Sequence, residues 1–373
     1  MYARKSDGKR TQDLQFSCLN LKMIFGEPLS GRPMKEQFYI QWHITNVCNL
    51  RCQHCYQNDF SKKNDLDWAG LEKVCDHLLR TMEEWGKTAC IHLTGGEPLL
   101  KPDLFLLLAH LDLHPMVEEL GIITNGLTID QEMMRRLSGF SKLKKMKISL
   151  DGGDAETNDS IRQKGAFDRV MQNLPLIKEA EGFEILFMLT VMKRNLRSLH
   201  SFFKLCHDIA IDGLIIERFI PLGRGRKVMD EVLDKEEWKE MVGMLVDLIS
   251  AEEAEHSLLP YQAFQIRFSG GELELLGAPC IIGVDGLCVM PEGNVFPCRR
   301  FPVPIGNLLE TPLRQIWEKS EILDKLRKKE NLKGKCGSCG INDCRGCRSL
   351  ALALTGDYLE EDPHCWYHDV FLE

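Results

Sequence analysis

The stretch TNVCNLRCQHCY, residues 45–56, contains three closely spaced cysteines, Cys48, Cys52 and Cys55, and no fourth. Thiolates normally hold a 4Fe-4S cluster four at a time, so a cluster held by these three has one iron free. A free iron can bind a small molecule, so the cluster can take part in a reaction of that molecule in addition to transferring electrons. Three cysteines in a zinc site or in an ordinary core are the alternative interpretation. The spacing predicts an iron-sulfur cluster whose chemistry depends on a further ligand.

On this CxxxCxxC spacing the sequence resembles the radical S-adenosylmethionine (SAM) superfamily. The resemblance implies that the amino and carboxylate groups of SAM chelate the free iron. It also implies that one electron from the cluster cleaves SAM to a 5'-deoxyadenosyl radical, which abstracts hydrogen from an unreactive C–H bond. His54 fills the usually aromatic position before the third cysteine. In such enzymes the cofactor performs the difficult chemical step, and the protein binds and orients the cofactor and the substrate.

The composition is that of a globular protein. A chain of 373 residues is long enough for about two domains with sizeable cores. Hydrophobic residues make up 44% and charged residues 27%, so no part of the chain is expected to be a polar, unfolded tract. No apolar run approaches the ~20 residues that a membrane span needs. The net charge of −8 argues against a nucleic-acid surface.

Cysteine usage indicates the compartment. Fifteen cysteines would suggest disulfides in a small secreted protein, but here they gather at metal-ligand spacings. The polar and basic start, from Met1 to Asp13, lacks the apolar segment of a secretory signal. We therefore expect a cytoplasmic protein that has neither a membrane nor a nucleic acid as its partner.

Short β-rich runs alternate with amphipathic helices from residue 38 onward. After the first run, apolar residues from Leu71 to Trp85 recur at helical spacing, and Asp67 can cap the start of that helix. The alternation predicts an α/β fold with a parallel sheet. It agrees with the partial (βα)6 TIM-like barrel of the resembled family, in which ligands gather at the carboxyl ends of the strands. The predicted strands are Phe38 to Ile44, Cys90 to Thr94, Leu120 to Thr124, Met146 to Leu150, Ile185 to Val191 and Leu214 to Phe219.

Several strand ends carry candidate SAM-binding residues. In TGGEP, residues 94–98, two glycines let the backbone approach a ligand and a carboxylate can accept from an amino group. Such a string alone is usually a turn; following the three-cysteine loop, it matches the superfamily's motif for the methionine amine of SAM. In related enzymes the residues matching Ser149 and Arg162 meet the ribose and carboxylate of SAM; a surface arginine is the alternative. The predicted SAM-binding residues are Gly95, Gly96, Glu97, Asn125, Ser149, Asp151 and Arg162, with no catalytic side chain assigned.

Other charged or reactive groups have simpler interpretations. The stretch 218–226, which closes the sixth strand, contains Arg218, Arg224 and Arg226. These arginines can bind a carboxylate or phosphate through two parallel hydrogen bonds, or they can lie in a solvated turn. The lysines at 142, 144, 145 and 147 precede a strand and are interpreted as an exposed helix end. Four cysteines stand alone at apolar positions and are interpreted as core residues: Cys18, Cys75, Cys90 and Cys206.

The C-terminal third contains eight more cysteines, which is twice the four of a complete cluster site. Their order resembles the SPASM auxiliary-cluster motif, or its shorter twitch relative, with one residue fewer in each of two spacers. The resemblance implies that Cys280, Cys298 and Cys347 hold one auxiliary cluster with Cys288 as a fourth ligand. It gives Cys336, Cys339, Cys344 and Cys365 to a second cluster. With the first loop, this makes three 4Fe-4S clusters.

Zinc is the alternative ligand of the C-terminal cysteines. Zinc ribbons usually separate their cysteine pairs by ~15–20 residues, and far fewer lie between Cys339 and Cys344. His364 and His368 flank Cys365 as other candidate ligands and are expected to face solvent.

Four segments follow from these motifs. We predict an N-terminal extension over residues 1–37, a radical SAM partial barrel over 38–230, a helical bridge over 231–278 and a SPASM-like domain over 279–373. The bridge contains Trp238, Met241, Leu245 and Leu248 on one helical face.

The resemblance implies an enzyme that abstracts hydrogen from a ribosomally made peptide or protein during post-translational modification. Expected partners are that peptide, an electron donor such as flavodoxin or ferredoxin, and a separate leader-peptide-binding protein. Modification of tetrapyrrole side chains in haem-type biosynthesis is the alternative, because Arg218, Arg224 and Arg226 suit a carboxylate-rich substrate. A non-catalytic iron-sulfur carrier or scaffold is an alternative of another class; it leaves Glu97 and Arg162 unexplained.

Overall fold

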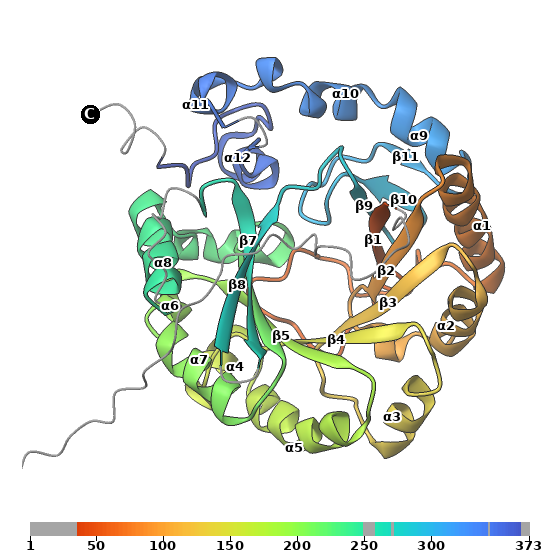
Figure 1. The fold of residues 1–373 in the computed structure, drawn as a ribbon, viewed down its shortest axis with the longest axis horizontal. Coiled ribbons are helices and arrows are strands. Elements are labelled where there is room, and N and C mark those ends of the chain that lie inside the picture. Colours follow the sequence, from red (N-terminus) through yellow and green to blue (C-terminus); the bar gives the residue numbers. More distant parts are fainter. Residues whose placement is uncertain (1–35, 249–257, 270–271, 342–343, 367–373) are drawn as a thin grey trace, which may run out of the picture.

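The computed structural model describes residues 36–248, 258–269, 272–341 and 344–366. Six parallel strands lie side by side in chain order, and helices surround them (Figure 1). All six predicted strands are confirmed, with small shifts at their ends, and the α/β partial barrel is confirmed with them. The strands are β1 (Gln37–His43), β2 (Thr88–Thr94), β3 (Val117–Thr124), β4 (Leu143–Ser149), β5 (Glu184–Val191) and β6 (Gly213–Arg218).

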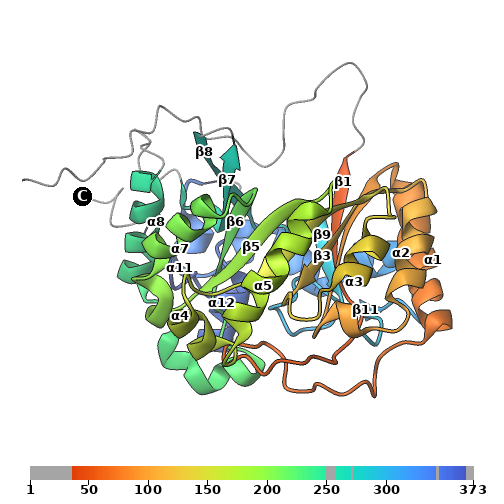
Figure 2. The same ribbon diagram turned by 90° about the horizontal axis from the view of Figure 1, so that it is seen from below.

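The helices between the strands cover the outer face of the sheet (Figure 2). Asp67 caps the first one as predicted: its Oδ1 accepts a hydrogen bond of 3.0 Å from the backbone N–H of Gly70. The helices of this part are α1 (Trp68–Trp85), α2 (Leu104–Leu113), α3 (Gln131–Leu137), α4 (Ala155–Ile161), α5 (Ala166–Glu179), α6 (Lys193–Leu196), α7 (Leu199–Asp208) and α8 (Lys235–Leu248).

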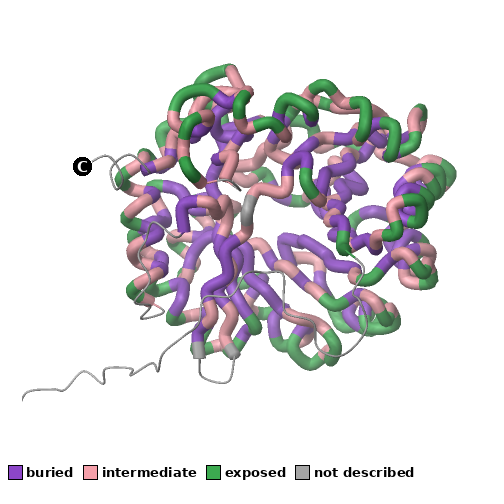
Figure 3. The backbone as a smooth tube through the Cα atoms, turned by 45° about the horizontal axis from the view of Figure 1, so that its top comes forward, coloured by how far each residue is buried: buried purple, intermediate pink, exposed green. Residues whose placement is uncertain are grey.

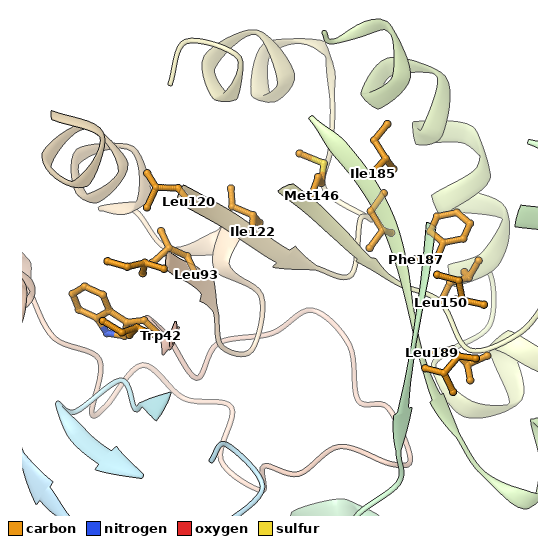
Figure 4. Packing of buried hydrophobic residues seen from close by; sticks show 14 of the residues in the cluster. Trp42, Leu93, Leu120, Ile122, Met146, Leu150, Ile185, Phe187 and Leu189 are labelled. Atoms are coloured by element: carbon orange, nitrogen blue, oxygen red, sulfur yellow. The ribbon is translucent and has the colours of Figure 1, made fainter. Parts of the chain in front are cut away.

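Alternate residues of each strand face opposite sides of the sheet. The outward set is mainly apolar and buried, and residues such as Trp42, Leu93 and Phe187 pack between the strands and the surrounding helices (Figure 4). Buried segments accordingly run through the middle of the molecule, with exposed ones at its periphery (Figure 3). The inward set is largely polar and lines a cavity: Tyr39, Gln41, Cys90, His92, Glu119, Lys145, Lys147 and Glu217.

The lysine run is the first correction to the sequence interpretation. It was expected at an exposed helix end, but Lys145 and Lys147 lie inside β4. Both side chains line the barrel cavity, because they share the inward face of that strand. Lys144, on the other face, is exposed.

Strands from the second half of the chain extend the sheet at both edges. β7 (Tyr261–Ser269) and β8 (Glu272–Pro279) add antiparallel strands beside β6. β9 (Gly286–Val289) pairs in parallel with β1, and β10 (Asn294–Phe296) and β11 (Gly306–Asn307) follow it. The described residues thus contain one eleven-stranded sheet, in the order β11-β10-β9-β1-β2-β3-β4-β5-β6-β7-β8. The segment 231–278 was expected to be helical; α8 is, but the residues after it form β7 and β8.

The remaining C-terminal elements are short helices: α9 (Leu313–Lys319), α10 (Glu321–Arg327), α11 (Gly334–Ser338) and α12 (Arg348–Thr355). They lie on the side of the barrel where β7 and β9 approach (Figure 1). Of the N-terminal extension, residues 1–35 lie outside the described residues. Among the described helices, none combines the length and apolar character of a membrane span.

Candidate active site

The three-cysteine loop follows β1 and lies over the carboxyl ends of the parallel strands. Cys48, Cys52 and Cys55 line one cavity of about 130 Å³. The same cavity is lined by residues that end β2, β3, β4 and β6, which is where barrel enzymes place their chemistry. Burial raises the pKa of Cys52 to about 12, so a bound metal cation is needed to offset the charge of its thiolate.

Gly95 and Gly96 hold the cysteine loop in place. The N–H of Gly96 donates to Thr45 O at 2.8 Å, and the N–H of Glu97 donates to Val47 O at 2.7 Å. A Cβ on Gly95 would lie 2.3 Å from Thr45 O, and one on Gly96 would lie 2.2 Å from Val47 O. Gly95 also has φ +146°, which disfavours any other residue there. Both glycines also line the cysteine cavity. Their lack of a side chain therefore allows close packing against the cysteine loop, and it would also allow a ligand in the cavity to approach their backbone.

The arginine loop after β6 has a different role from the one predicted. Arg224 donates to the carbonyl oxygens of Arg51 and Cys52 at 3.3 and 3.4 Å, and the N–H of Gly225 donates to Cys55 O at 3.0 Å. This loop therefore binds the backbone of residues 51–55, whereas Gly96 and Glu97 bind the backbone of residues 45–47.

Arg218 and Arg226 do not form a shared anion site with Arg224; the alternative interpretation, a solvated turn, fits Arg226. Arg218 forms a buried ion pair with Asp362 at 2.8 Å and stacks over Trp238, while Arg226 is exposed. The partner of Arg218 lies far away in the sequence, so the spacing of the arginines could not reveal it.

Glu97 lies beneath the cavity and is fully buried. Its carboxylate accepts hydrogen bonds from Thr124 Oγ1 at 2.7 Å, from the N–H of Asn125 at 2.8 Å and from the N–H of Leu99 at 3.2 Å. Burial outweighs these donors and raises the pKa of Glu97 to about 7. Two oxygens can accept about four hydrogen bonds, so one position is left for an amino group. The contact with SAM stays a prediction.

Asp151 positions two residues of the cavity and does not line it. Its Oδ2 lies 2.7 Å from His54 Nε2 and 2.8 Å from Arg162 Nε, and its Oδ1 accepts from the N–H of Thr190 at 2.9 Å. Burial opposes ionisation, but Arg162 and His54 overcome it and lower the pKa of Asp151 to about 2. Arg162 thus carries a neutralising partner and still lines the cavity beside Cys52.

The remaining predicted residues lie on the cavity wall. Asn125 donates from Nδ2 to Asn49 Oδ1 at 2.7 Å, which ties the end of β3 to the cysteine loop. Ser149, at the end of β4, lines the cavity across from it. Three thiols, an arginine, a serine and an amide around one cavity fit the thiolate and polar groups that a cluster with bound SAM requires. Of the seven predicted residues, Glu97 and Asp151 are the two that do not line the cavity.

A second and larger cavity of about 410 Å³ fills the barrel interior. It carries more positive than negative side chains, with an apolar wall that includes Ile123, Met188 and Ile215. Two arginines, Arg299 and Arg300, line both cavities, so the two adjoin. Its cationic residues are Lys145, Lys147, Arg267, Arg299, Arg300 and Arg348, and its acidic residues are Glu119, Glu217 and Asp285.

The sequence interpretation missed this arginine pair. Arg299 and Arg300 both reach Glu217 on β6, and Arg300 Nη1 also donates to Arg218 O at 2.8 Å. They directly follow Cys298, and that adjacency to a predicted cluster ligand was the one available signal. Glu217 faces the barrel because it alternates with the outward Ile216.

The eight C-terminal cysteines fall into two groups. Cys280, Cys288, Cys298 and Cys347 all line the large cavity. A separate cavity of about 20 Å³ is lined by Cys336, Cys339, Cys344 and Cys365. This is the division that the SPASM resemblance implies. Four thiols around each centre match the donor set of a closed cluster, and the first centre faces the large cavity.

Two predictions about single histidine and cysteine residues are wrong, and two more concern residues that the structure does not describe. His364 was expected to face solvent, but it is buried, lies 2.9 Å from Leu233 O and stacks on Trp238. Cys75 and Cys206 are core residues as predicted, whereas Cys90 faces the large cavity from β2. Cys18 and His368 lie outside the described residues.

Comparisons with known proteins agree with this geometry. The radical SAM superfamily model matches residues 42–206, and the SPASM iron-sulfur cluster-binding domain matches residues 280–340. The AdoMet-dependent heme synthase of Methanosarcina barkeri is 33% identical over 347 residues, which are 88% of this chain and 96% of the relative. Mycofactocin maturase MftC of Mycobacterium tuberculosis is 30% identical over 341 residues, 87% of this chain and 82% of the relative.

Among solved structures, native anSMEcpe with bound AdoMet and Cp18Cys peptide superimposes with a TM-score of 0.69, covering 89% of this chain and 95% of that one. Its sequence is 18% identical, so this likeness shows the fold. A SAM-binding 4Fe-4S cluster and auxiliary iron-sulfur clusters are the cofactors of the matched domains. The chain belongs to the radical SAM superfamily of enzymes and carries a SPASM iron-sulfur domain in its C-terminal third.

Proposed function

We propose that this enzyme uses radical SAM chemistry to modify carboxylate-bearing side chains of a tetrapyrrole. The observation that carries the proposal is the large cavity, which combines an apolar wall with six cationic and three acidic side chains. A tetrapyrrole offers a flat apolar ring and carboxylates at its edge, which is the complementary pattern. The relative with the higher identity and coverage supports the same class, since it is a heme synthase. The tetrapyrrole alternative is therefore favoured over the peptide substrate that the sequence alone favoured.

Arg299 and Arg300 are the residues that we expect to orient the substrate. Both belong to the large cavity and to the cysteine cavity, so a carboxylate held there would place its side chain near the cluster loop. Each arginine already pairs with Glu217, which keeps the pair desolvated and fixed. When bound, SAM and its cluster at Cys48, Cys52 and Cys55 would supply the 5'-deoxyadenosyl radical. Gly95, Gly96, Asn125, Ser149 and Arg162 would hold SAM, with Glu97 and Asp151 beneath them.

Eleven cysteines divide as three, four and four, so we expect three 4Fe-4S clusters and about twelve irons per chain. Anaerobic reconstitution with iron and sulfide, followed by metal analysis, tests this load. About four irons per chain, with zinc bound at the remaining cysteines, would overturn the assignment of two auxiliary clusters. A low-potential donor such as flavodoxin or ferredoxin would reduce the enzyme, and the reducing cytoplasm suits its thiolates.

The proposal is tested by substrate trials with the reduced, reconstituted enzyme and SAM. Porphyrins with propionate side chains, with and without iron, should stimulate 5'-deoxyadenosine release and undergo a change in mass. Arg300→Lys should bind the porphyrin more weakly while SAM cleavage without substrate continues, because lysine cannot make the forked contact. Porphyrins that neither bind nor change in mass would overturn the tetrapyrrole assignment.

Peptide modification is the second candidate, and the similarity to mycofactocin maturase MftC favours it. A ribosomally made peptide would occupy the same cavity, with a separate leader-binding protein to deliver it. Mass spectrometry of peptides encoded near the gene, incubated with the enzyme and SAM, distinguishes the two candidates. Modification of such a peptide, with porphyrins left unchanged, would establish this second function.

A further inference from the structure

Three potential metal ligands, none of them among the eleven predicted cluster cysteines, meet on the wall of the large cavity. They are Cys90 and His92 on β2 and Glu119 on β3. Cys90 Sγ lies 3.6 Å from His92 Nε2 and 3.3 Å from Glu119 Oε1, and His92 Nε2 lies 3.3 Å from Glu119 Oε1. Neither the radical SAM chemistry nor the SPASM clusters use these residues.

These separations match the edges of a tetrahedral metal site. Zinc binds thiolate sulfur at about 2.3 Å and imidazole nitrogen or carboxylate oxygen at about 2.0–2.2 Å, which separates neighbouring ligand atoms by about 3.3–3.6 Å. The donor set, one soft sulfur with one nitrogen and one oxygen, is typical of zinc and similar divalent transition metals. The three atoms therefore outline one face of a tetrahedron.

The backbone brings the three side chains together. Residues two apart on a strand point to the same side, so Cys90 and His92 both face the cavity. Cys90 is paired in register with Glu119, and His92 with Gly121. The register shifts next to Cys90, so that Glu118 is the extra residue and Glu119 turns inward.

The imidazole of His92 is also fixed from behind. Its Nδ1 lies 3.0 Å from the hydroxyl of Tyr39 on β1, and the two rings meet edge to face. A Cβ on Gly121 would lie 2.5 Å from His92 Cδ2, so the glycine leaves the space that the ring occupies. A histidine ligand commonly has such a partner on its second nitrogen, which directs the first nitrogen at the metal.

We propose that Cys90, His92 and Glu119 bind a zinc-like divalent metal ion and leave its fourth coordination position open to the large cavity. Binding would convert the Cys90 thiol to a metal-bound thiolate and release its proton to solvent. Lys145, 3.1 Å from Glu119 Oε1, would stay paired with the carboxylate. The metal at the centre of a metalloporphyrin can accept only axial ligands. Three protein donors that converge on one point therefore fit a metal ion that is not held in a macrocycle.

The competing explanation is a hydrogen-bond network. In that case Cys90, His92 and Lys145 all donate to Glu119, and no ion is needed. The two explanations differ in one measurable property, which is stoichiometric metal binding by enzyme whose clusters are complete.

The test uses enzyme reconstituted anaerobically with iron and sulfide, so that the cluster cysteines are already occupied. Zinc chloride is titrated against a chromophoric chelator, and zinc X-ray absorption then identifies the ligands. We expect one zinc per chain with a single sulfur among nitrogen and oxygen neighbours. Zinc surrounded by four sulfurs would be zinc misloaded into a cluster site, and it would overturn the proposal, as would no binding.

Matched variants assign the binding to these residues. Cys90→Ala and Cys90→Ser should both lose stoichiometric zinc, and Tyr39→Phe should weaken binding about ten- to hundredfold. Cys206→Ala is the control, because Cys206 is a buried cysteine of α7 that packs in the hydrophobic core. Unchanged iron content and circular dichroism establish that each variant is folded. Zinc retained by a folded Cys90→Ser or Cys90→Ala enzyme would overturn the site.

Discussion

The carboxylate of Asp362 accepts a hydrogen bond of 2.7 Å from the backbone N–H of Cys347. The backbone N–H of the same aspartate lies 3.3 Å from Cys336 Sγ, and its side chain pairs with Arg218 at the end of β6. One buried residue therefore contacts a cysteine of each C-terminal group and the barrel. Arg218, buried with it, has this carboxylate as its counter-ion, although burial alone would oppose the charge of both.

Replacing Asp362 should consequently damage both auxiliary sites. We expect Asp362→Asn to cost about 3–5 kcal/mol of stability, because it leaves the Arg218 charge buried and unpaired. The measurement is thermal unfolding with iron analysis. Glu318→Gln is the control: it breaks an exposed ion pair with Arg314 and should leave the stability almost unchanged, because solvent screens such pairs. Equal losses in the two variants would contradict the structural role of Asp362.

Glu97 should make SAM binding depend on pH near neutrality. Burial raises the pKa of its carboxyl to about 7, so the group is charged above this pH and neutral below it. If the carboxylate accepts from the amino group of SAM, affinity should fall by up to about tenfold for each pH unit below 7. Calorimetry at several pH values measures this, and Glu97→Gln should show a flat profile. A flat profile in the unmodified enzyme would place Glu97 outside SAM binding.

Lys147 should give the opposite pH dependence for an anionic substrate. Burial and the neighbouring Lys145 lower the pKa of Lys147 to about 8, so its positive charge is lost as pH rises through that value. We expect KM for a carboxylate-bearing substrate to rise above about pH 8, while SAM cleavage without substrate does not follow the same curve. Lys147→Met should have a raised KM at every pH, whereas Lys319→Met, on the exposed surface of α9, should behave as the parent enzyme.

The role of Cys288 as fourth ligand of the first auxiliary site can be tested by substitution. If it closes this cluster, Cys288→Ala should open one iron and alter the electron paramagnetic resonance signal or shed the cluster. SAM cleavage with an artificial reductant should persist, since the loop around Cys52 is intact. Cys75→Ala, at a buried position within α1, is the matched control. Full iron content and an unaltered spectrum in Cys288→Ala would exclude Cys288 as a ligand.

Strand positions and motif residues were predictable because they depend on local patterns. The six parallel strands follow from apolar runs, and the motifs at their ends follow from chain order. The β7–β8 hairpin was missed, although Gly270 and Gly271 between two alternating runs are a hairpin signal. The mistake at Lys147 has another cause: a run of lysines looks solvated unless the inward face of the strand is known to line a cavity.

Residues whose roles depend on distant partners could not be predicted. Arg218 looked like a ligand-binding arginine because Asp362, its counter-ion, comes from the other end of the chain. Arg299 and Glu217 form the boundary between the two cavities only after the C-terminal segment packs on β6. Spacing predicts the cluster cysteines, whereas the large cavity is assembled from almost every strand.

The pairing of β9 with β1 has a consequence for biosynthesis. β1 gains its second neighbour only when residues 286–289 have been made, so one edge of this strand stays unpaired after the other five parallel strands have been synthesised. The barrel is therefore not an independent module that an auxiliary domain decorates. A chain that ends before residue 286 would expose the backbone groups of that edge to other chains, and we expect it to aggregate more readily than the full chain.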